Sequence, residues 1–533
     1  MTQKFEPGRR SLLLGSGAAV AAAFGGPLTA MAKRVEYRDG AACVAAPASS
    51  VVDSPYGPTA PVNDLTTGLP LVELPVGFRY ASYGWTGDQM ADGLITPAAH
   101  DGMGIVSERR VGVGHEIILV RNHELSGSND PTSIIGFGRD VGPGAVAKHD
   151  AGKTGNSYQR GGTTTLVWRN NQWVDSYASF GGLIRPCAGG SSTWGSWLSN
   201  EETLSNNISD AGKKHGYIFE VRADTSLIAA NPNPIVAMGR FNHEASAIDP
   251  ATGYWYLTED QGNANTLYRF LPNNIQGGLN SLHAGGSLQG LAVKGARNRD
   301  LRNPALCDEF VCEWVNVANP DADALIRMGG MGGLEVVGVG TVTASGPYAQ
   351  AYAEGAAIFG ANEGCWVADG IVYFTDKQVT SAPARAGRIW ALHLASMTLK
   401  AVFVSDDKQV GNSPDNVCIT PRGGVLFCED GGPGSPNPTG APIISQRLMG
   451  VTAKGQSYVF AKHNFNFTRS QLEGAGKLAV APAAVEGQDP RRDNRNTEWA
   501  GAVFSSDGHT LFVNLYTPGI TLAIQGPWAR GTL

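Results

Sequence analysis

Acidic residues follow several short apolar runs in this sequence, and their positions indicate a shared site. The runs end at Glu201 and Glu202, at Glu259 and Asp260, at Asp376, and at Glu429 and Asp430. If the runs are strands whose ends converge, the carboxylates repel one another unless a cation lies among them. Oxygen ligands in such number suit Ca²⁺, and an added thiolate suits a transition metal. We therefore expect a metal site at these strand ends, the alternative for each acid alone being a solvated turn.

Cys187 is the candidate thiolate, because it lies in the turn Arg185-Pro186-Cys187-Ala188-Gly189 just before the first acidic pair. A metal lowers the pKa of a thiol, whereas the alternative is a small buried residue or half of a disulfide. The seven cysteines include no C-x-x-C pair, which argues against a zinc ribbon and a thioredoxin-like site. Two Asn-His-Glu sequences, at 122–124 and 242–244, are either ligand pairs or hydrogen-bonded loops.

The elements that would position these residues are short strands. Apolar runs of a few residues, bounded by Gly, Asn, Asp and Pro, recur in six hairpin-like units along the chain. The 70 glycines among 533 residues fit tight hairpin turns, which need positive φ angles. Spaced units of this kind are typical of propellers and sandwiches. We predict an all-β fold, a single large β-propeller over residues 76–533, with six irregular blades and inserted loops.

The first residues resemble an export signal rather than part of the fold. Arg9 and Arg10 precede a weakly apolar run that ends at Ala30-Met31-Ala32, a pattern typical of a Tat-type signal peptide over residues 1–32. An ordinary secretory signal is the alternative. Residues 33–75 then form an extended leader that packs on the body. No other stretch approaches the roughly 18 apolar residues of a membrane span. We expect export by the Tat machinery to the periplasm or medium, without stable membrane association.

The composition excludes several other classes of protein. The chain has 41 basic and 47 acidic residues and a formal net charge of −6, which argues against a nucleic-acid partner. A hydrophobic content of 42% supports a large core. The sequence has no Walker loop, no H-E-x-x-H motif and no G-x-S-x-G elbow in a strand–turn–helix context.

Several phrases in order along the chain resemble the PhoX family of secreted alkaline phosphatases. They are Asn122-His123-Glu124, Cys187-Ala188-Gly189-Gly190, 194–202, Phe241-Asn242-His243-Glu244-Ala245, Glu363-Gly364-Cys365-Trp366, Pro414-Asp415-Asn416, Glu498-Trp499-Ala500-Gly501 and 504–514. The resemblance implies a monomeric six-bladed propeller that hydrolyses small phosphomonoesters with Ca²⁺ and Fe³⁺ ions in its channel. It further implies metal ligation by Cys187, Glu201, Glu202, Glu244, Glu363, Asp415 and Glu498.

One position departs from the family pattern, which has a phosphate-clamping arginine where this chain has Ala361. An alanine cannot supply the bidentate, charged contact of a guanidinium. Asn362 can donate a neutral hydrogen bond instead, and Arg385 is our candidate for the missing charge, with Arg121 and Arg185 as further candidates. The departure keeps two other functions open, a calcium-dependent propeller lactonase or esterase and a non-catalytic propeller that binds metal.

Overall fold

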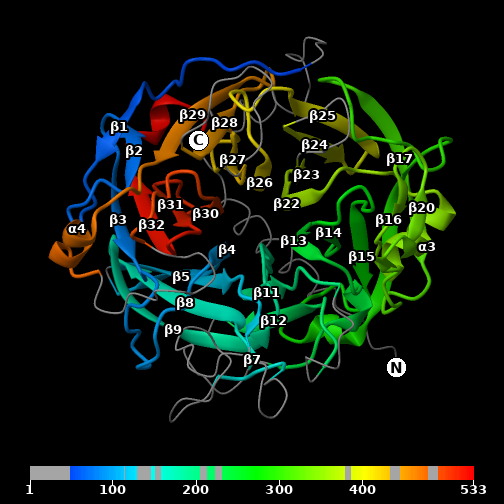
Figure 1. Cartoon of the computed structure of the whole chain (residues 1–533), viewed down its shortest axis with the longest axis horizontal. Helices are drawn as coiled ribbons and strands as arrows, with labels where there is room; N and C mark the ends of the chain where they lie inside the picture. Colours follow the sequence, from blue (N-terminus) through cyan, green and yellow to red (C-terminus); the bar gives the residue numbers. More distant parts are fainter. Residues whose placement is uncertain are drawn as a thin grey trace, which may run out of the picture.

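Antiparallel sheets surround a central axis in the computed structural model (Figure 1). The structure describes residues 48–112, 114–128, 146–150, 158–204, 213–222, 231–377, 386–431, 445–477 and 490–533. The predicted signal peptide and Arg385 lie outside these residues. Strands dominate the described part, and its helices are short: α3 (Gly346–Glu354), α4 (Arg469–Gly474) and the 3₁₀ turns η1 (Val236–Met238), η2 (Ser281–Ala284) and η3 (Trp528–Arg530). The predicted all-β propeller class is confirmed.

The first half of the ring contains three groups of consecutive antiparallel strands. The first group is β4 (His100–Val111), β5 (Gly114–His123), β8 (Gly161–Arg169) and β9 (Gln172–Leu183). The second is β10 (Gly190–Ser191), β11 (Ser196–Asn200) and β12 (Ile218–Arg222). The third is β13 (His243–Ile248), β14 (Trp255–Glu259), β15 (Tyr268–Pro272), β16 (Gly286–Val293) and β17 (Glu309–Val317).

The second half repeats the arrangement. One group is β22 (Asn362–Ala368), β23 (Ile371–Asp376), β24 (Gly387–His393) and β25 (Thr398–Ser405), and β17 joins it to the β13–β16 group in one sheet. The next is β26 (Pro414–Ile419), β27 (Val425–Glu429), β28 (Arg447–Val451) and β29 (Ser457–His463), followed by β30 (Trp499–Phe504), β31 (Thr510–Leu515) and β32 (Ile520–Gln525). Because the groups differ in strand number and two share a sheet, the count of six blades stays a prediction.

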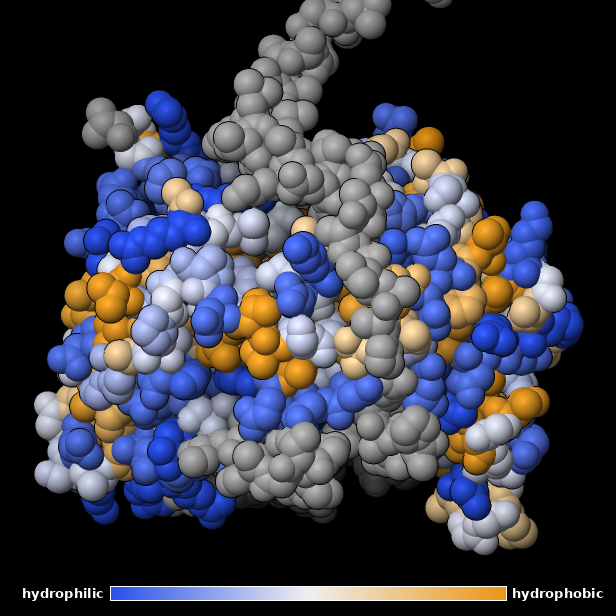
Figure 2. Space-filling model, turned by 90° about the horizontal axis from the view of Figure 1, so that it is seen from above, coloured by the Kyte–Doolittle hydropathy of each residue, from blue (hydrophilic) through white to orange (hydrophobic). Residues whose placement is uncertain are grey.

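Short hairpins lie between or beside these groups. They are β6 (Gly127–Ser128) with β7 (Tyr158–Gln159), β18 (Arg327–Met328) with β19 (Met331–Gly332), and β20 (Leu334–Val336) with β21 (Gly340–Val342). Within the described residues, no helix is both long and apolar enough to cross a membrane. Figure 2 shows hydrophobic residues in small patches between hydrophilic ones on the coloured part of one face.

Strands from the start of the chain close the ring with strands from its end (Figure 1). β3 (Arg79–Tyr83) pairs with β32, and β2 (Val72–Pro75), itself paired with β1 (Thr59–Val62), pairs with β29. The Tyr56 hydroxyl lies 2.8 Å from the Leu533 backbone nitrogen, from which it accepts a hydrogen bond. Part of the segment predicted as a leader, β1 and β2, is therefore strand within one of the sheets.

Five of the six inner strands have a β-bulge close to their first residue. On β13, three steps from His243 to Ser246 face two steps from Glu259 to Leu257 on β14. The same irregularity occurs near the start of β4, β22, β26 and β30. A bulge bends the strand and redirects the side chains at its start. The acids that lie within these bulges, Asp101, Glu244, Glu363 and Asp415, belong to the side-chain cluster described below.

Small residues at these bulges let the inner strands approach each other closely. A Cβ atom on Gly364 would lie 2.6 Å from the backbone nitrogen of Val417, and one on Gly102 would lie 2.2 Å from the Ala188 carbonyl oxygen. Below the bulges the channel contains a cavity of about 200 Å³, lined largely by small residues with Met103, Trp197 and Trp366. The strand starts are thus held within reach of one another around a narrow axis.

Candidate metal centre

Each inner strand contributes one acid or thiol at or just before its start. These residues are Asp101 on β4, Cys187 before β10, Glu244 on β13, Glu363 on β22, Asp415 on β26 and Glu498 before β30. Five of the six are buried, with Glu244 fully inaccessible and Cys187 exposed by only 8%, and Glu498 is half-buried. We call these six residues the inner ring. The inner ring thus contains five of the seven predicted ligands, Cys187, Glu244, Glu363, Asp415 and Glu498, together with Asp101, which the sequence does not predict. These residues meet at the starts of the inner strands, whereas the sequence predicts a site at strand ends.

The inner ring contains sets of ligand atoms at distances that suit shared cations. Ligand atoms of Glu244, Glu363 and Asp415 lie within 4.8 Å of one another, as do those of Cys187, Glu202 and Glu244. A third set joins Cys187 to Asp101 and Glu124, and the Cys187 thiol donates a hydrogen bond to Asp101 at 3.2 Å. Cys187 and Glu244 each belong to two sets, so the described residues form one continuous cluster.

In five of the six groups the second strand adds a charged residue just past its pairing with the inner strand. These residues are Glu124 after β5, Glu202 after β11, Asp260 after β14, Lys377 after β23 and Asp430 after β27. We call them the outer ring. The outer ring is acidic except at Lys377. After burial, Asp260 is the main cause that raises the pKa of Glu363 in the inner ring, and Glu124 and Asp260 raise that of Glu202 within the outer ring itself.

Glu201 and Glu202 are adjacent, but their side chains have different surroundings. Glu201 accepts hydrogen bonds from the backbone of Ile184 at 2.9 Å and of Gly216 at 2.8 Å, and its Oε1 lies 2.6 Å from His215 Nδ1. Glu202 instead belongs to the cluster and lies 2.5 Å from a guanidinium nitrogen of Arg185. Successive side chains of a strand point to opposite faces, which accounts for the difference. Of the two predicted ligands, only Glu202 lies with the other candidates.

The pairing of Glu201 with His215 shifts both groups toward their charged forms. Burial opposes the charge on His215, but Glu201 and Asp150 on either side raise its pKa to about 9. Burial likewise opposes the charge on Glu201, and His215 nevertheless lowers the pKa of that carboxyl. Glu201 is thus an ionised residue whose oxygens are already occupied within its own strand group.

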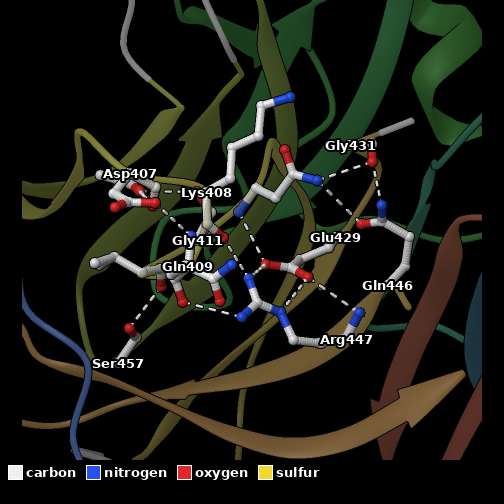
Figure 3. A network of polar contacts seen from close by, with 12 residues as sticks. Asp407, Lys408, Gln409, Gly411, Glu429, Gly431, Gln446, Arg447 and Ser457 are labelled. Carbon is white, nitrogen blue, oxygen red and sulfur yellow. Dashed lines mark hydrogen bonds and ion pairs between the residues drawn. The ribbon is translucent and has the colours of Figure 1, made fainter. Parts of the chain in front are cut away.

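The same arrangement recurs at the equivalent acid of other groups. Asp376 pairs with Arg388 at 3.0 Å, and Glu259 accepts a hydrogen bond from the Tyr268 hydroxyl at 2.5 Å. In Figure 3 the guanidinium of Arg447 faces the carboxylate of Glu429, at 2.6 and 2.8 Å. In the pairs Glu201-Glu202, Glu259-Asp260 and Glu429-Asp430, the first carboxylate therefore binds a partner on a neighbouring segment, and the second reaches the channel.

Burial and mutual repulsion dominate the electrostatics of the inner ring. Burial first, and neighbouring carboxylates second, raise the pKa of Asp101 and Glu244 well above their usual range. The pKa of Asp415 rises to about 7 through burial and Asp430, against the opposing effect of Lys377. Burial and Asp101 also raise the pKa of the Cys187 thiol. A bound cation would favour the ionised forms of these groups and would therefore lower their pKa values.

Two cationic side chains lie in the cluster. Lys377 Nζ lies 2.9 Å from Glu363, 2.8 Å from Asp430 and 3.5 Å from Asp415. Arg185 bridges Glu124 and Glu202, at 2.9 and 2.5 Å, and its side chain is 42% exposed. These two charges are fewer than the surrounding carboxylates, so the cluster keeps an excess of negative charge.

The donor set fits metal ions. Neither carboxylate oxygen of the buried Glu244 has a geometrically acceptable hydrogen-bond partner among the described residues, and the same holds for Oδ1 of Asp101. Buried polar atoms without partners are costly, and a bound cation would satisfy them. Carboxylate oxygens suit Ca²⁺, while the Cys187 thiol is a ligand type that favours iron over calcium.

The residues predicted to contact substrate are placed differently. Asn362 is fully buried beside Glu363, and neither its amide nitrogen nor its amide oxygen has a partner among the described residues, so its catalytic role stays a prediction. Arg385 falls outside the described residues. Arg121 is buried away from the carboxylates and donates to Thr521 at 2.6 Å. Of the two candidate arginines that the structure describes, Arg185 lies in the cluster and Arg121 does not.

Sequence reasoning missed part of the cluster. Asp101 follows no recognisable strand, because it lies near the start of β4, and its only local signal is the adjacent His100. Glu124 was noted within an Asn-His-Glu phrase but not assigned a role. Lys377 directly follows Asp376, at the position where the other strand ends carry a second acid. Comparing these strand ends with one another could have identified the last two.

Comparisons with known proteins agree with this architecture. The sequence profile of the family described as Alkaline phosphatase PhoX matches residues 54–179 and 172–519. A solved structure of Pseudomonas fluorescens PhoX, in complex with the transition-state analogue vanadate, is 14% identical, with a TM-score of 0.57 over 91% of this chain and 99% of that one.

A gluconolactonase from Xanthomonas campestris is more distant. It is 11% identical, with a TM-score of 0.33 over 81% of this chain and 96% of that one, which is too low to bear on the fold. No curated protein matches the sequence. The family match spans most of the described propeller, including every residue of the inner and outer rings. This chain therefore belongs to the PhoX family of alkaline phosphatases.

Proposed function

We propose that this chain hydrolyses small phosphomonoesters at a centre of Ca²⁺ and Fe³⁺ ions held by the inner ring. The observation that carries the proposal is the convergence of buried, mutually repelling carboxylates with one thiol in the channel of a PhoX-family chain. Bound ions would neutralise the charge of the phosphate and lower the pKa of a water nucleophile. The chain itself supplies the ligands, their orientation and the exclusion of bulk water.

The ligand roles follow from chemistry and position. Cys187 would hold iron, since a thiolate is the softest donor in the cluster. Glu244 lies in two of the candidate ligand sets and would supply carboxylate oxygen to the ions of both. Glu363, Asp415 and Glu202 would complete the oxygen donors, with Glu498, Asp101 and Glu124 at the margins.

Arg185 is our candidate for the charged contact with substrate. Its guanidinium is partly exposed and is held by Glu124 and Glu202, which also fix its orientation. A planar guanidinium can bind two phosphate oxygens at once. This placement would compensate for Ala361, with Asn362 and Arg385 as the remaining predicted contacts.

The proposal includes export before function. The twin-arginine signal would direct a folded, metal-loaded chain through the Tat machinery, with the mature protein acting as a periplasmic or secreted monomer. Fusion of residues 1–40 to a reporter, compared with a variant carrying Arg9→Lys and Arg10→Lys, tests this step. Export that persists in the double variant and requires the general secretory pathway would contradict it.

The activity is tested on the protein exported through its own signal. We expect hydrolysis of p-nitrophenyl phosphate, its loss on treatment with EGTA, and calcium and iron in elemental analysis. Activity that survives complete chelation would contradict the metal mechanism. A parallel assay with a simple lactone distinguishes the second enzyme class, since turnover of the lactone without phosphatase activity would favour it.

Cys187→Ser is the variant that tests the role of iron. We expect loss of iron and of any thiolate-to-iron absorption band, because an alcohol is a harder and far weaker donor. Cys418→Ser is the matched control, since Cys418 is also a buried free thiol but belongs to the hydrophobic core. Iron content that is equal in the two variants would contradict the assignment.

A further inference from the structure

Lys377 breaks the pattern of the outer ring. Four other members of this ring, Glu124, Glu202, Asp260 and Asp430, are acidic, and each directly follows a residue that pairs with the start of an inner strand. Lys377 has the same place, because Asp376 pairs with Asn362 at the start of β22. The fold thus puts an ammonium group at a position where four other strand groups have a carboxylate.

The Lys377 ammonium is surrounded by carboxylates. Its nitrogen lies 2.9 Å from Glu363 Oε1, 2.8 Å from Asp430 Oδ2 and 3.5 Å from Asp415 Oδ2. These three contacts are ion pairs, and Glu363 Oε1 has no hydrogen-bond partner of acceptable geometry among the described residues. The two shorter separations are only slightly longer than the roughly 2.3–2.6 Å of calcium–oxygen bonds. The nitrogen therefore occupies the place that a cation shared by these three acids would take.

The backbone of Lys377 is fixed, which holds the side chain in this position. Its amide nitrogen donates to the Ala361 carbonyl at 2.8 Å, and its own carbonyl accepts from Arg388 at 2.8 Å. Arg388 is in turn fully buried against Asp376. Only about a quarter of the Lys377 side chain is exposed, so the charge is partly shielded from water.

We propose that the Lys377 ammonium is a built-in cation that replaces one divalent ion between Glu363, Asp415 and Asp430. The inference rests on the proposed metal centre and specifies its composition. The lysine supplies one positive charge where a calcium ion would supply two, and it cannot dissociate. The centre of this chain would therefore hold fewer exchangeable ions on the Asp430 side than on the side of Cys187.

Metal stoichiometry of the purified full chain tests the inference without an activity assay. Inductively coupled plasma mass spectrometry, after equilibration in buffered Ca²⁺, should find about one more calcium ion per chain in Lys377→Met than in the wild type. Methionine keeps much of the volume of the lysine stem and removes the charge, which leaves three acids to bind an ion. Lys477→Met is the matched control, because Lys477 pairs with Asp88 at 2.8 Å outside the cluster.

A second variant keeps the inference testable if Lys377→Met does not fold. Asp430→Asn removes one acceptor of the ammonium from a partly exposed position, and it should leave the number of bound ions unchanged. Two results would overturn this inference and leave the proposed metal centre standing. They are the loss of a bound ion in Asp430→Asn and an unchanged number of calcium ions in a folded Lys377→Met. A wild-type chain that binds no ion overturns both the inference and the metal centre.

Discussion

The neighbours Glu201 and Glu202 show how a single step along a strand separates structural from functional carboxylates. Glu201 is ionised against His215 and has both oxygens occupied, whereas Glu202 faces other acids and has a raised pKa from burial and from Glu124. Although the two side chains are chemically identical, removing the charge of Glu201 would affect the fold, whereas removing the charge of Glu202 would affect the acidic cluster. The pair provides a matched test of the cluster at the scale of one residue.

We expect Glu202→Gln to lower the metal content, with little loss of stability. Glu201→Gln should retain the metal but destabilise the fold by about 3 kcal/mol or more, because it leaves the buried His215 without its partner charge. Elemental analysis and urea unfolding of the two variants measure both effects. A stable Glu201→Gln variant that has lost metal would mean that Glu201 is a ligand after all.

His215 makes a pH-dependent contribution to stability. Its pKa is raised to about 9 in the folded protein, so its stabilising effect is complete below the ordinary value near 6.5 and is lost as the pH rises through about 9. The size of the shift corresponds to about 2–3 kcal/mol at neutral pH. The stability difference between the wild type and His215→Gln should shrink by that amount between pH 6 and pH 10. A difference that stays constant in urea unfolding would contradict it.

At the scale of elements, the inner strands position the ligands through bulges and close backbone contact. Glu363 and Asp415 belong to neighbouring strands, β22 and β26, and Gly364 lies between them with no room for a side chain. A Cβ atom there would meet the backbone of Asp415 and Val417 at 2.7 and 2.6 Å, so the strands would have to separate. The spacing of the ligands thus depends on a residue that binds nothing.

We expect Gly364→Val to reduce metal content and to destabilise the protein by about 3 kcal/mol, in the range of overpacked cores. Gly474→Ala is the control, because a Cβ atom at Gly474 at the end of α4 meets nothing within 4 Å. Thermal unfolding and elemental analysis of both variants are the measurements. Full metal content in Gly364→Val would show that the ligand spacing does not depend on this contact.

The sequence predicts that acidic residues lie at the ends of strands, but it does not predict which acid of each pair faces the channel. That choice depends on pairing register and on the bulges, which arise from contacts between distant strands such as β13 and β14. Glu259 and Glu429 are acids at strand ends, yet the carboxylate of each is occupied by a partner on the next strand, Tyr268 or Arg447. Those partners are separated from them by the connections between strands, whose geometry the local sequence pattern does not specify. Glu244, Glu363 and Asp415 lie in phrases that include the bulge itself, and Cys187 lies in a turn before β10.

At the scale of the whole molecule, the cluster connects all the strand groups around the axis. β3 and β2 join the two ends of the chain to one ring, and the inner ring draws a residue from every group of that ring. Ions at the centre would therefore stabilise the closed propeller as well as the site. Without ions, the same carboxylates would repel one another across the channel.

This dual role predicts that the stabilisation by metal increases with pH. Carboxyls with a raised pKa, such as Asp415 at about 7, bind more protons in the folded than in the unfolded chain. The metal-free protein therefore loses stability as the pH rises from about 4 through 7 and beyond. The loaded protein avoids this loss, because its carboxylates are ionised and paired with cations. The difference in Tm between loaded and fully chelated protein should thus be larger at pH 8.5 than at pH 6, measured by calorimetry. A difference that is constant, or larger at the lower pH, would mean that the raised carboxyls do not hold the ions.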